Sequence, residues 1–343
     1  MFFKEELLSK LHLFPGWSEE VPKDRPLRIV FMGTPDFAVP TLQALLDGPH
    51  EVVSVYTQPD RPKGRGRKLK PPPVKVLALE AGIPVFQPEK MTSPEAYDRF
   101  KSDDPDLAVV IAYGKILRPR ILAIPRLGCI NCHASLLPYY RGAAPIYWAV
   151  HNGEAETGVC TMMMNAGMDT GPELLRGSID IGPNETVGSV HDRLSALSAS
   201  LLTDTVDALL EGTLELHPQE ESLATYASML SKNENWINFA LPSEQVHNKI
   251  RALDPFPGAR CLLPNDTQMK LFASSNRPDV SGEPGSLVEV TQDSVVIACE
   301  TGGIALREIQ MPGKKRMAVS SYLAGQTFPS DLKLRTPELT ENV

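Results

Sequence analysis

Short apolar runs alternate with amphipathic segments through the first two thirds of the chain. The runs are apolar on both faces and bounded by glycine or proline, as in strands buried within a sheet. We expect such strands at residues 27–33, 52–58, 83–88, 106–114, 127–133 and 157–164. Helical patterns lie between them, and the longest amphipathic one covers residues 189–212. This alternation predicts an α/β fold with a Rossmann-like, mostly parallel sheet covered on both faces.

The pattern changes after about residue 225. A helix is predicted between Pro242 and Pro255, and short strand patterns with turn signals follow it, at residues 261–264, 269–275, 285–291, 294–300 and 303–310. Their spacing is typical of a small antiparallel β-barrel. We therefore expect an N-terminal extension, an α/β domain, a linker, a barrel domain and a polar tail, at residues 1–26, 27–225, 226–236, 237–335 and 336–343.

Composition narrows the class of protein. The 343 residues suffice for two domains, and 42% apolar with 22% charged residues is typical of a soluble globular protein. The sequence contains no run of about 18 apolar residues, the length that a membrane-spanning helix needs. Residues 1–26 lack the apolar core of a secretory signal, so a cytoplasmic protein is expected. The five cysteines do not indicate a disulfide framework.

The cysteine spacing also bears on metals. Cys129 and Cys132 form a CxxC followed by His133. No second Cys/His pair stands at zinc spacing, and a c-type haem requires export, which nothing in the sequence signals. We therefore predict no metal site. The first strand is also not followed by a G-x-G-x-x-G fingerprint. We therefore do not expect a nicotinamide cofactor, despite the Rossmann-like order of elements.

Two polar side chains stand at the end of the strand predicted at 127–133. Asn131 and His133 are two residues apart and should point to the same face. Their strand would end at the carboxyl edge of the sheet, where open α/β folds bind ligands. An amide donor and an imidazole there could stabilise a developing oxyanion. The alternative is a capped strand end with a hydrogen-bonded histidine.

A carboxylate follows the next strand. Asp169 lies in the loop AGMDTG, between Gly167 and Gly171. Beside His133 it could orient the imidazole, keep it charged and accept a proton through water. The alternative is a turn-forming aspartate.

The stretch DRPKGRGRKLKPPPVK at 60–75 is strongly basic. Its seven cations and one acid give +6, so the rest of a chain of net charge −8 carries −14. Glycines and a triple proline predict an irregular loop, and the density of unpaired cations favours a nucleic-acid partner over a solvated loop. A smaller cluster lies in PGKKRM at 312–317. Lys75 is the seventh cation of the basic stretch. The candidate contacts are Arg61, Lys63, Arg65, Arg67, Lys68, Lys70, Lys314, Lys315 and Arg316.

Several motifs together resemble one family. FMGTPDFAVPTLQAL, the basic stretch, AYGKIL, NCHASLLPYYRGAAP, MDTGPELL and PGKKRM occur here in the order expected of methionyl-tRNA formyltransferases, over roughly residues 27–325. The resemblance implies formyl transfer from 10-formyltetrahydrofolate to methionyl initiator tRNA, without a metal. It implies catalysis by Asn131, His133 and Asp169, tRNA contact by the basic stretch, and an oligonucleotide-binding (OB) type of C-terminal barrel. It also implies a folate site at Tyr113, Gly114, Ser135, Leu136, Leu137 and Pro138.

Some positions depart from the family pattern, and some alternatives stay open. Asn165 stands where an acid is usual, and the linker residues Asn233, Asn235 and Trp236 replace a more charged run. A formyltransferase acting on a ribonucleotide or an amino-sugar nucleotide, or a formyl-folate hydrolase, would share the Asn-x-His and Asp motifs but would not need the basic stretch. A tRNA-binding protein with a lapsed site is a further alternative. We expect a monomer that binds no membrane.

Overall fold

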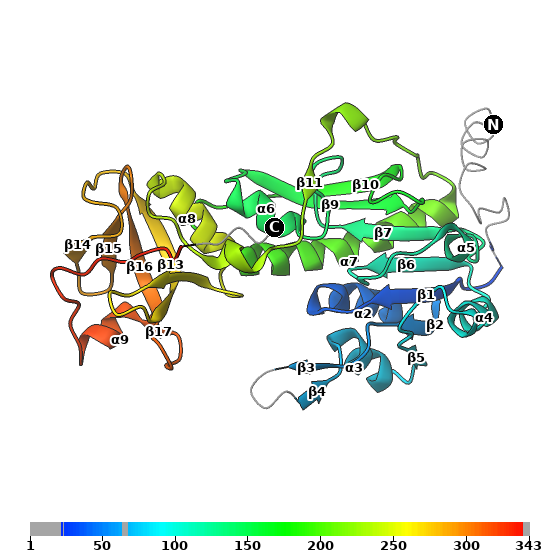
Figure 1. Ribbon diagram of the computed structural model, residues 1–343. Coiled ribbons are helices and arrows are strands. Elements are labelled where there is room, and N and C mark those ends of the chain that lie inside the picture. Colours follow the sequence, from blue (N-terminus) through cyan, green and yellow to red (C-terminus); the bar gives the residue numbers. More distant parts are fainter. Residues whose placement is uncertain (1–21, 23, 64–67, 339–343) are drawn as a thin grey trace. The chain divides into compact units, whose positions relative to one another are not determined.

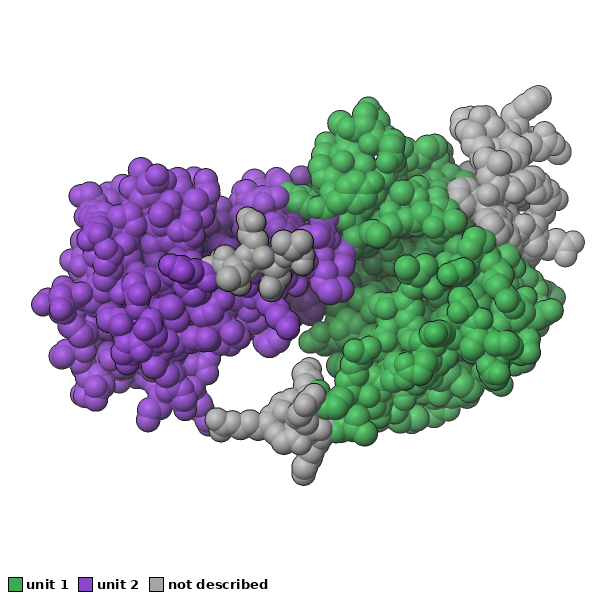
Figure 2. Space-filling model, viewed as in Figure 1, with its two compact units in different colours: residues 1–142, 158–179, 192–226 green, residues 143–157, 180–191, 227–343 purple. Residues whose placement is uncertain are grey.

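The structure is a computed structural model that describes residue 22 and residues 24–63 and 68–338. The chain forms two compact units (Figure 2). Unit 1 comprises residues up to 142, 158–179 and 192–226, and unit 2 comprises residues 143–157, 180–191 and those from 227 onward. Segments of the predicted α/β region thus belong to both units.

A seven-stranded sheet organises unit 1 (Figure 1). Its strand order is β10-β9-β7-β6-β1-β2-β5. The neighbours from β5 to β7 are parallel, and β9 runs antiparallel to β7. The strands are β1 Arg28–Gly33, β2 Glu51–Tyr56, β5 Val85–Phe86, β6 Leu107–Ile111, β7 Cys129–His133, β9 Glu156–Met163 and β10 Glu173–Asp180. The prediction of an α/β fold with a mostly parallel sheet is confirmed.

The helices of the α/β region lie where the pattern predicts them, except for the four-residue helix Pro119–Leu122, which the pattern does not predict. They are α2 Val39–Asp47, α3 Pro73–Glu80, α4 Pro94–Ser102, α5 Pro119–Leu122, α6 Pro145–His151 and α7 Val187–Glu211, with short 3₁₀ turns at Asp36–Ala38, Glu221–Leu223 and Lys232–Asn235. Ser93 caps α4 by accepting from the Ala96 N–H at 3.2 Å. Gly212, at φ 71°, follows α7 in the left-handed conformation that ends many helices. None of the described helices is long and apolar enough to cross a membrane.

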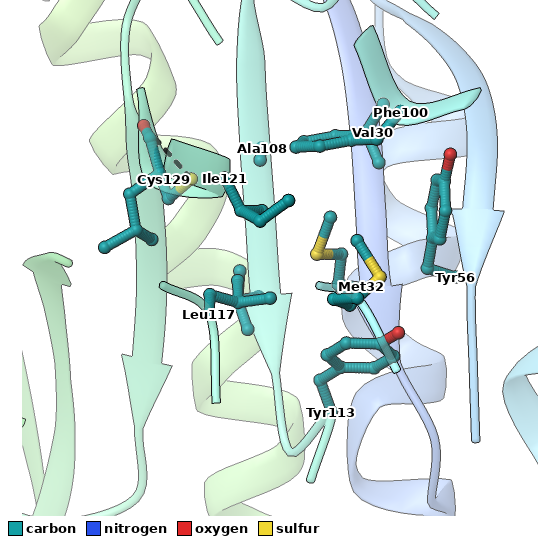
Figure 3. Close-up of a cluster of buried hydrophobic side chains, with 12 residues drawn as sticks. Val30, Met32, Tyr56, Phe100, Ala108, Tyr113, Leu117, Ile121 and Cys129 are labelled. Atoms are coloured by element: carbon teal, nitrogen blue, oxygen red, sulfur yellow. Dashed lines mark hydrogen bonds between the residues drawn. The ribbon is translucent and has the colours of Figure 1, made fainter. Parts of the chain in front are cut away.

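The core of unit 1 lies on the faces of the parallel strands. Met32 of β1 and Ala108 of β6 are fully buried and pack with Phe100 of α4 (Figure 3). The Tyr56 hydroxyl at the edge of this cluster donates to Asp103 Oδ2 at 2.7 Å. Strands buried on both faces account for the continuous apolar runs in the sequence.

The carboxyl ends of β1, β2 and β6 are joined by side-chain hydrogen bonds. The strand order reverses between β1 and β6, because β2 and β5 follow on one side and β6 and β7 on the other. Just beyond these strands, Thr34 Oγ1 donates to Tyr113 O at 3.1 Å. The Gln58 amide donates to Tyr113 O at 3.1 Å and to Gly114 O at 2.9 Å. Open α/β sheets bind their ligands at such a reversal.

Besides α6 and the first turn of α7, unit 2 contains an antiparallel sheet and the helices that flank it in sequence. Its order is β12-β13-β16-β15-β14, with β17 paired to β16. The bounds are α8 Ser243–Ala252, β12 Ala259–Leu262, β13 Gln268–Arg277, β14 Leu287–Val290, β15 Val295–Ala298, β16 Gly303–Gln310, β17 Met317–Ala318 and α9 Val319–Leu323. The helix predicted between two prolines is α8. Residues 332–335 hydrogen-bond to both ends of this order, at Leu262 and at Leu287.

The basic stretch is not the irregular loop that the sequence predicts. The short strands β3 Arg61–Lys63 and β4 Lys68–Lys70 pair antiparallel, with Arg61 opposite Lys70. Glycine and proline exclude a strand within a central sheet, but they leave a separate two-stranded ribbon possible because its outer edges need no partners. Pro62 stands in such an edge. Residues 64–67 lie outside the described residues.

The strand β10 is missing from the sequence prediction. Its exposure alternates from Leu175 to Asp180, as expected for a strand with one face in solvent. The run ELLRGSID has too little apolar content at its second half to register as a strand. The short strands β8 Arg141–Gly142 and β11 Tyr226–Ala227 were likewise not predicted, since two residues carry no periodicity.

Candidate active site

Asn131 and His133 end β7 and are both buried. The two residues are 9% and 6% exposed, and the intervening Cys132 belongs to the opposite face. Among the described residues, no hydrogen bond reaches the Asn131 side chain, although β7 is paired on both sides, to Val110 and Met162. The amide nitrogen and oxygen still reach solvent, as expected of a polar group without a protein partner. An unpartnered amide at a sheet's carboxyl edge is therefore available to a ligand.

The contacts of His133 fix the roles of its two ring nitrogens. Nε2 lies 3.0 Å from the carbonyl oxygen of Tyr140. A carbonyl can only accept, so Nε2 carries a hydrogen and donates it. Nδ1 lies 3.7 Å from Asp169 Oδ2, which is too long for a hydrogen bond. The nitrogen that faces the carboxylate is thus the one that a water molecule or a reacting group can approach.

Asp169 is held by its surroundings rather than by a regular element. It lies in the left-handed region, at φ 53°. Its Oδ2 accepts from the Gly142 N–H at 2.8 Å. Within the same loop, Asn165 Oδ1 accepts from the Gly167 N–H and the Thr170 hydroxyl, each at 2.9 Å. The unusual Asn165 therefore shapes the loop, a task for which its carbonyl oxygen serves as well as a carboxylate.

Backbone strain gathers around this edge of the sheet. Of the six non-glycine residues with positive φ among those described, three flank the candidate side chains: Ala112, Tyr140 and Asp169, at 47°, 59° and 53°. Each such residue costs about 1–3 kcal/mol, and such residues cluster at active sites. The cost is consistent with a backbone that is shaped for a ligand.

The predicted folate residues surround the same edge but differ in exposure. Ser135 and Leu137 are fully buried. The Ser135 hydroxyl donates to Tyr139 O at 2.6 Å, and Leu137 packs with Cys160. Their side chains therefore shape the loop. Leu136 is half-buried, Pro138 is buried, and the carbonyl of Gly114 is held by Gln58.

The side chain of Tyr113 lies in an unusual environment. It is 2% exposed, and its hydroxyl has no hydrogen-bond partner among the described residues. Burial raises the pKa of this phenol above its ordinary value. Ile116, three residues further along the chain, is 84% exposed, and Met168 beside Asp169 is 64% exposed. Exposed apolar side chains next to the polar trio suit a ligand with an aromatic or alkyl portion.

The sequence did not indicate two residues that shape this site. Arg141 is 1% exposed, and the Gln219 side chain bonds both to it and to the Asp169 loop. Arginine is almost never fully buried unless it is paired, so the position of Arg141 within RGAAP was a usable signal. Gln219 lies in an irregular segment after α7, and nothing in the sequence marks it.

The CxxC cysteines lie in the core. Burial raises the pKa of both Cys129 and Cys132 to about 12. Their thiols are therefore protonated near neutral pH and are poor ligands or nucleophiles. Within the described part of the chain, no group of three His, Cys, Asp or Glu side chains is placed to hold a metal ion.

The basic residues divide into exposed and paired groups. Arg61 and Lys70 are exposed, as are Lys314 and Lys315. Lys75 is paired, because its Nζ lies 2.8 Å from Asp60, so the expectation of cations without counter-ions fails there. Arg65 and Arg67 lie outside the described residues, and the side chains of Lys63 and Lys68 are not described.

Arg316 is also paired. Its guanidinium bonds to Asp254, at 2.5 Å for the shorter contact, and to Glu308. It also lies 4.2 Å from the ring centre of Phe272. The carboxylates raise the pKa of Arg316 despite an opposing effect of burial. Within this turn, Lys314 and Lys315 are the cations open to a partner.

Comparisons with known proteins match both parts of the chain. A family model described as "Formyl transferase" matches residues 27–206, and one described as "Formyl transferase, C-terminal domain" matches residues 229–327. The chain is 48% identical over 308 residues to the methionyl-tRNA formyltransferase of Geobacter metallireducens, covering 90% of this chain and 98% of that protein. It is 50% identical over 297 residues to that of Pelobacter propionicus, covering 87% and 92%.

Solved structures share the fold at lower identity. The N-formyltransferase from Helicobacter canadensis, in complex with folinic acid and dTDP-3-aminofucose, is 19% identical with a TM-score of 0.61. The match covers 85% of this chain and 100% of that one. Likeness at this level extends to the fold alone.

Proposed function

The chain belongs to the formyl transferase family, and we propose that it transfers a formyl group from 10-formyltetrahydrofolate to the α-amino group of methionyl initiator tRNA, using Asn131, His133 and Asp169. The family assignment follows from near-complete matches to methionyl-tRNA formyltransferases. The observation that supports the catalytic assignment is the amide of Asn131, which has no hydrogen-bond partner among the described residues and lies two residues from a histidine that faces a carboxylate.

The reaction needs what these three side chains offer. The methionyl nitrogen attacks the formyl carbon, and a tetrahedral oxyanion forms. The bond from that carbon to N10 of the folate then breaks. N10 gains a proton, and the attacking nitrogen loses one. The Asn131 amide and an Nδ1–H of His133 would donate to the oxyanion, and Asp169 would orient His133 and help to take up the proton.

The contribution expected of each catalytic side chain to the rate is typical of a site that stabilises an oxyanion. Removing one oxyanion donor costs on the order of 2.7–4 kcal/mol of transition-state stabilisation. Alignment of the two substrates contributes as well, because it replaces a bimolecular encounter with a reaction inside one complex. The strained turns at Ala112 and Asp169 are consistent with such preorganisation.

The tRNA partner would be recognised through exposed cations. Arg61 and Lys70 face each other across the β3–β4 ribbon, and both are exposed. We propose that this ribbon meets the acceptor stem and detects a weak or unpaired first base pair, which is cheap to open. Lys314 and Lys315 would add a second contact with the phosphate backbone.

The same proposal includes the barrel fold of unit 2, the oligomeric state and the roles of the two parts of the chain. In unit 2, residues 332–335 bond both to Leu262 at the end of β12 and to Leu287 of β14. This contact joins the two ends of the strand order and supports an OB-like barrel, since closing a sheet removes its edges. We further propose a monomer that acts in the cytoplasm, with residues 27–225 performing transfer and residues 237–335 binding tRNA.

The test is formyl transfer from 10-formyltetrahydrofolate to methionylated initiator tRNA, with methionylated elongator tRNA as the matched substrate. We expect rapid transfer to the initiator alone. Equal transfer to both would refute the role given to the ribbon. Transfer to neither, with folate still bound, would refute the proposed substrate and direct attention to an amino-sugar or ribonucleotide acceptor.

A further inference from the structure

One side-chain amide holds the loop that carries Asp169. Gln219 Nε2 donates to Asp169 O at 2.8 Å and to Gly171 O at 2.7 Å. Its Oε1 accepts from Arg141 Nε at 3.0 Å. The amide therefore uses both of its hydrogens on one loop and its oxygen on the RGAAP segment.

These contacts close a ring around the carboxylate. Arg141 is fully buried, and its Nη1 also bonds to Glu221 at 2.8 Å, so its position is fixed. The next residue, Gly142, donates its N–H to Asp169 Oδ2. Asp169 is thus held at its carbonyl by Gln219 and at its carboxylate by Gly142, and Arg141 connects the two supports.

The loop requires such support. Asp169 adopts a left-handed conformation that a non-glycine residue leaves unless its surroundings hold it. Gly171 packs closely against the neighbouring strand, because a Cβ there would lie 1.7 Å from Met163 O. Gln219 itself is anchored, since His217 and Glu173 exchange two backbone hydrogen bonds of 2.9 Å just before it.

We propose that Gln219 is a positioning residue for formyl transfer, and that it acts by fixing the Asp169 carboxylate against His133. This inference rests on the proposed catalytic role of Asp169. Without the amide, two loop carbonyls lose their donors and the loop relaxes. A displacement of about 1 Å at a catalytic group costs roughly a hundredfold in rate. Gln219 touches neither reacting group in this account, so substrate affinity should change little.

The primary variants are Gln219→Ala and Gln219→Glu. The second keeps an oxygen for Arg141 but places acceptors against the carbonyls of Asp169 and Gly171. We expect kcat to fall about tenfold to a hundredfold in both, with KM for folate and for tRNA within about twofold of wild type. The control is Glu220→Gln, an isosteric change at the adjacent exposed residue, which should behave as wild type.

A double-mutant cycle decides whether Gln219 acts through Asp169. Single-turnover rates are measured for Asp169→Ala, Gln219→Ala and the double variant. If Gln219 acts through the carboxylate, the second change should slow Asp169→Ala less than about threefold. Independent, multiplying losses would overturn the proposal, as would a wild-type kcat in both Gln219 variants.

The cycle also separates this proposal from the proposed function. Near-normal transfer by Asp169→Ala would remove Asp169 from the mechanism and would overturn both. A strong loss in Asp169→Ala with normal turnover in Gln219→Ala would overturn only the role of Gln219. Thermal unfolding and near-UV circular dichroism verify folding. If Gln219→Ala does not fold, Gln219→Glu, which retains the acceptor for Arg141, gives the deciding kcat and KM.

Discussion

Replacing Asn131 by leucine should stabilise the protein and abolish most of its activity. The two side chains have the same number of heavy atoms and a similar shape, so β7 can accept the change without a cavity. A buried polar group without a partner costs about 1–3 kcal/mol. Because Asn131 keeps 9% exposure and its amide still reaches solvent, we expect at most the lower end of that range, up to about 1 kcal/mol gained. This corresponds to a rise in Tm of about 2–4 °C for a domain of this size.

The activity should move in the opposite direction. Loss of one donor to the oxyanion corresponds to a fall of roughly 10²–10³ in kcat. Thr161→Val is the matched control on the neighbouring strand. Thr161 is fully buried like a core residue, but its hydroxyl contacts Thr205 at 2.8 Å and accepts from the Leu175 N–H. Its loss should lower Tm and leave kcat nearly unchanged.

The assays are calorimetric unfolding and formyl transfer at saturating folate and tRNA. The reasoning would be refuted if Asn131→Leu lowered Tm as far as Thr161→Val does and still transferred the formyl group. The Asn131 amide would then be a structural group. A lower Tm together with lost transfer would contradict the stability argument alone, because the catalytic argument needs only the missing donor.

Three further predictions concern charge. Arg61→Ala and Lys70→Ala should each flatten the dependence of log K for tRNA on log salt by about one unit and leave folate binding unchanged; a steep unchanged slope would exclude phosphate contact. Arg316→Ala should cost about 2 kcal/mol of stability, seen as a lower Tm, because it unpairs buried Asp254, whereas Lys315→Ala should affect only the salt slope. Burial lowers the pKa of His247, so the unfolded chain, titrating near 6.5, binds more protons below that pH. Stability should therefore fall from pH 7 to pH 5.5, and His247→Gln should reduce the fall; an identical pH profile would exclude this source.

The fold could be predicted largely because most of its elements carry local signals. The strands β1, β6 and β7 are buried on both faces and therefore read as continuous apolar runs. Proline and glycine mark the ends of helices such as α8. The elements that were missed depend on tertiary context. The ribbon β3–β4 forms from prolines and lysines, and β10 is a strand with one solvated face.

The site could be predicted only where residues share a strand or a short loop. Asn131 and His133 are two residues apart, so period-two geometry places them together. The approach of Asp169 to His133 depends on the antiparallel pairing of β7 with β9, which the sequence does not specify. The pairing states of Lys75 and Arg316 were equally out of reach, since composition counts charges without their partners.

Two glutamine side chains support the backbone of this site in the same way. Gln58 donates two hydrogen bonds to the carbonyls of Tyr113 and Gly114, after the strained residue Ala112 at the end of β6. Gln219 does the same for the carbonyls around the strained Asp169. The strained backbone of each turn costs free energy. In each turn, the amide of a glutamine distant in sequence donates to two carbonyls that lie outside the sheet and the helices. Gln58 directly precedes the basic stretch and Gln219 lies in no motif, and neither context indicates this role, because the only requirement is an amide at the right place. Strain at the site is therefore maintained by residues that sequence patterns leave unmarked, and substitutions there should impair transfer before they impair folding.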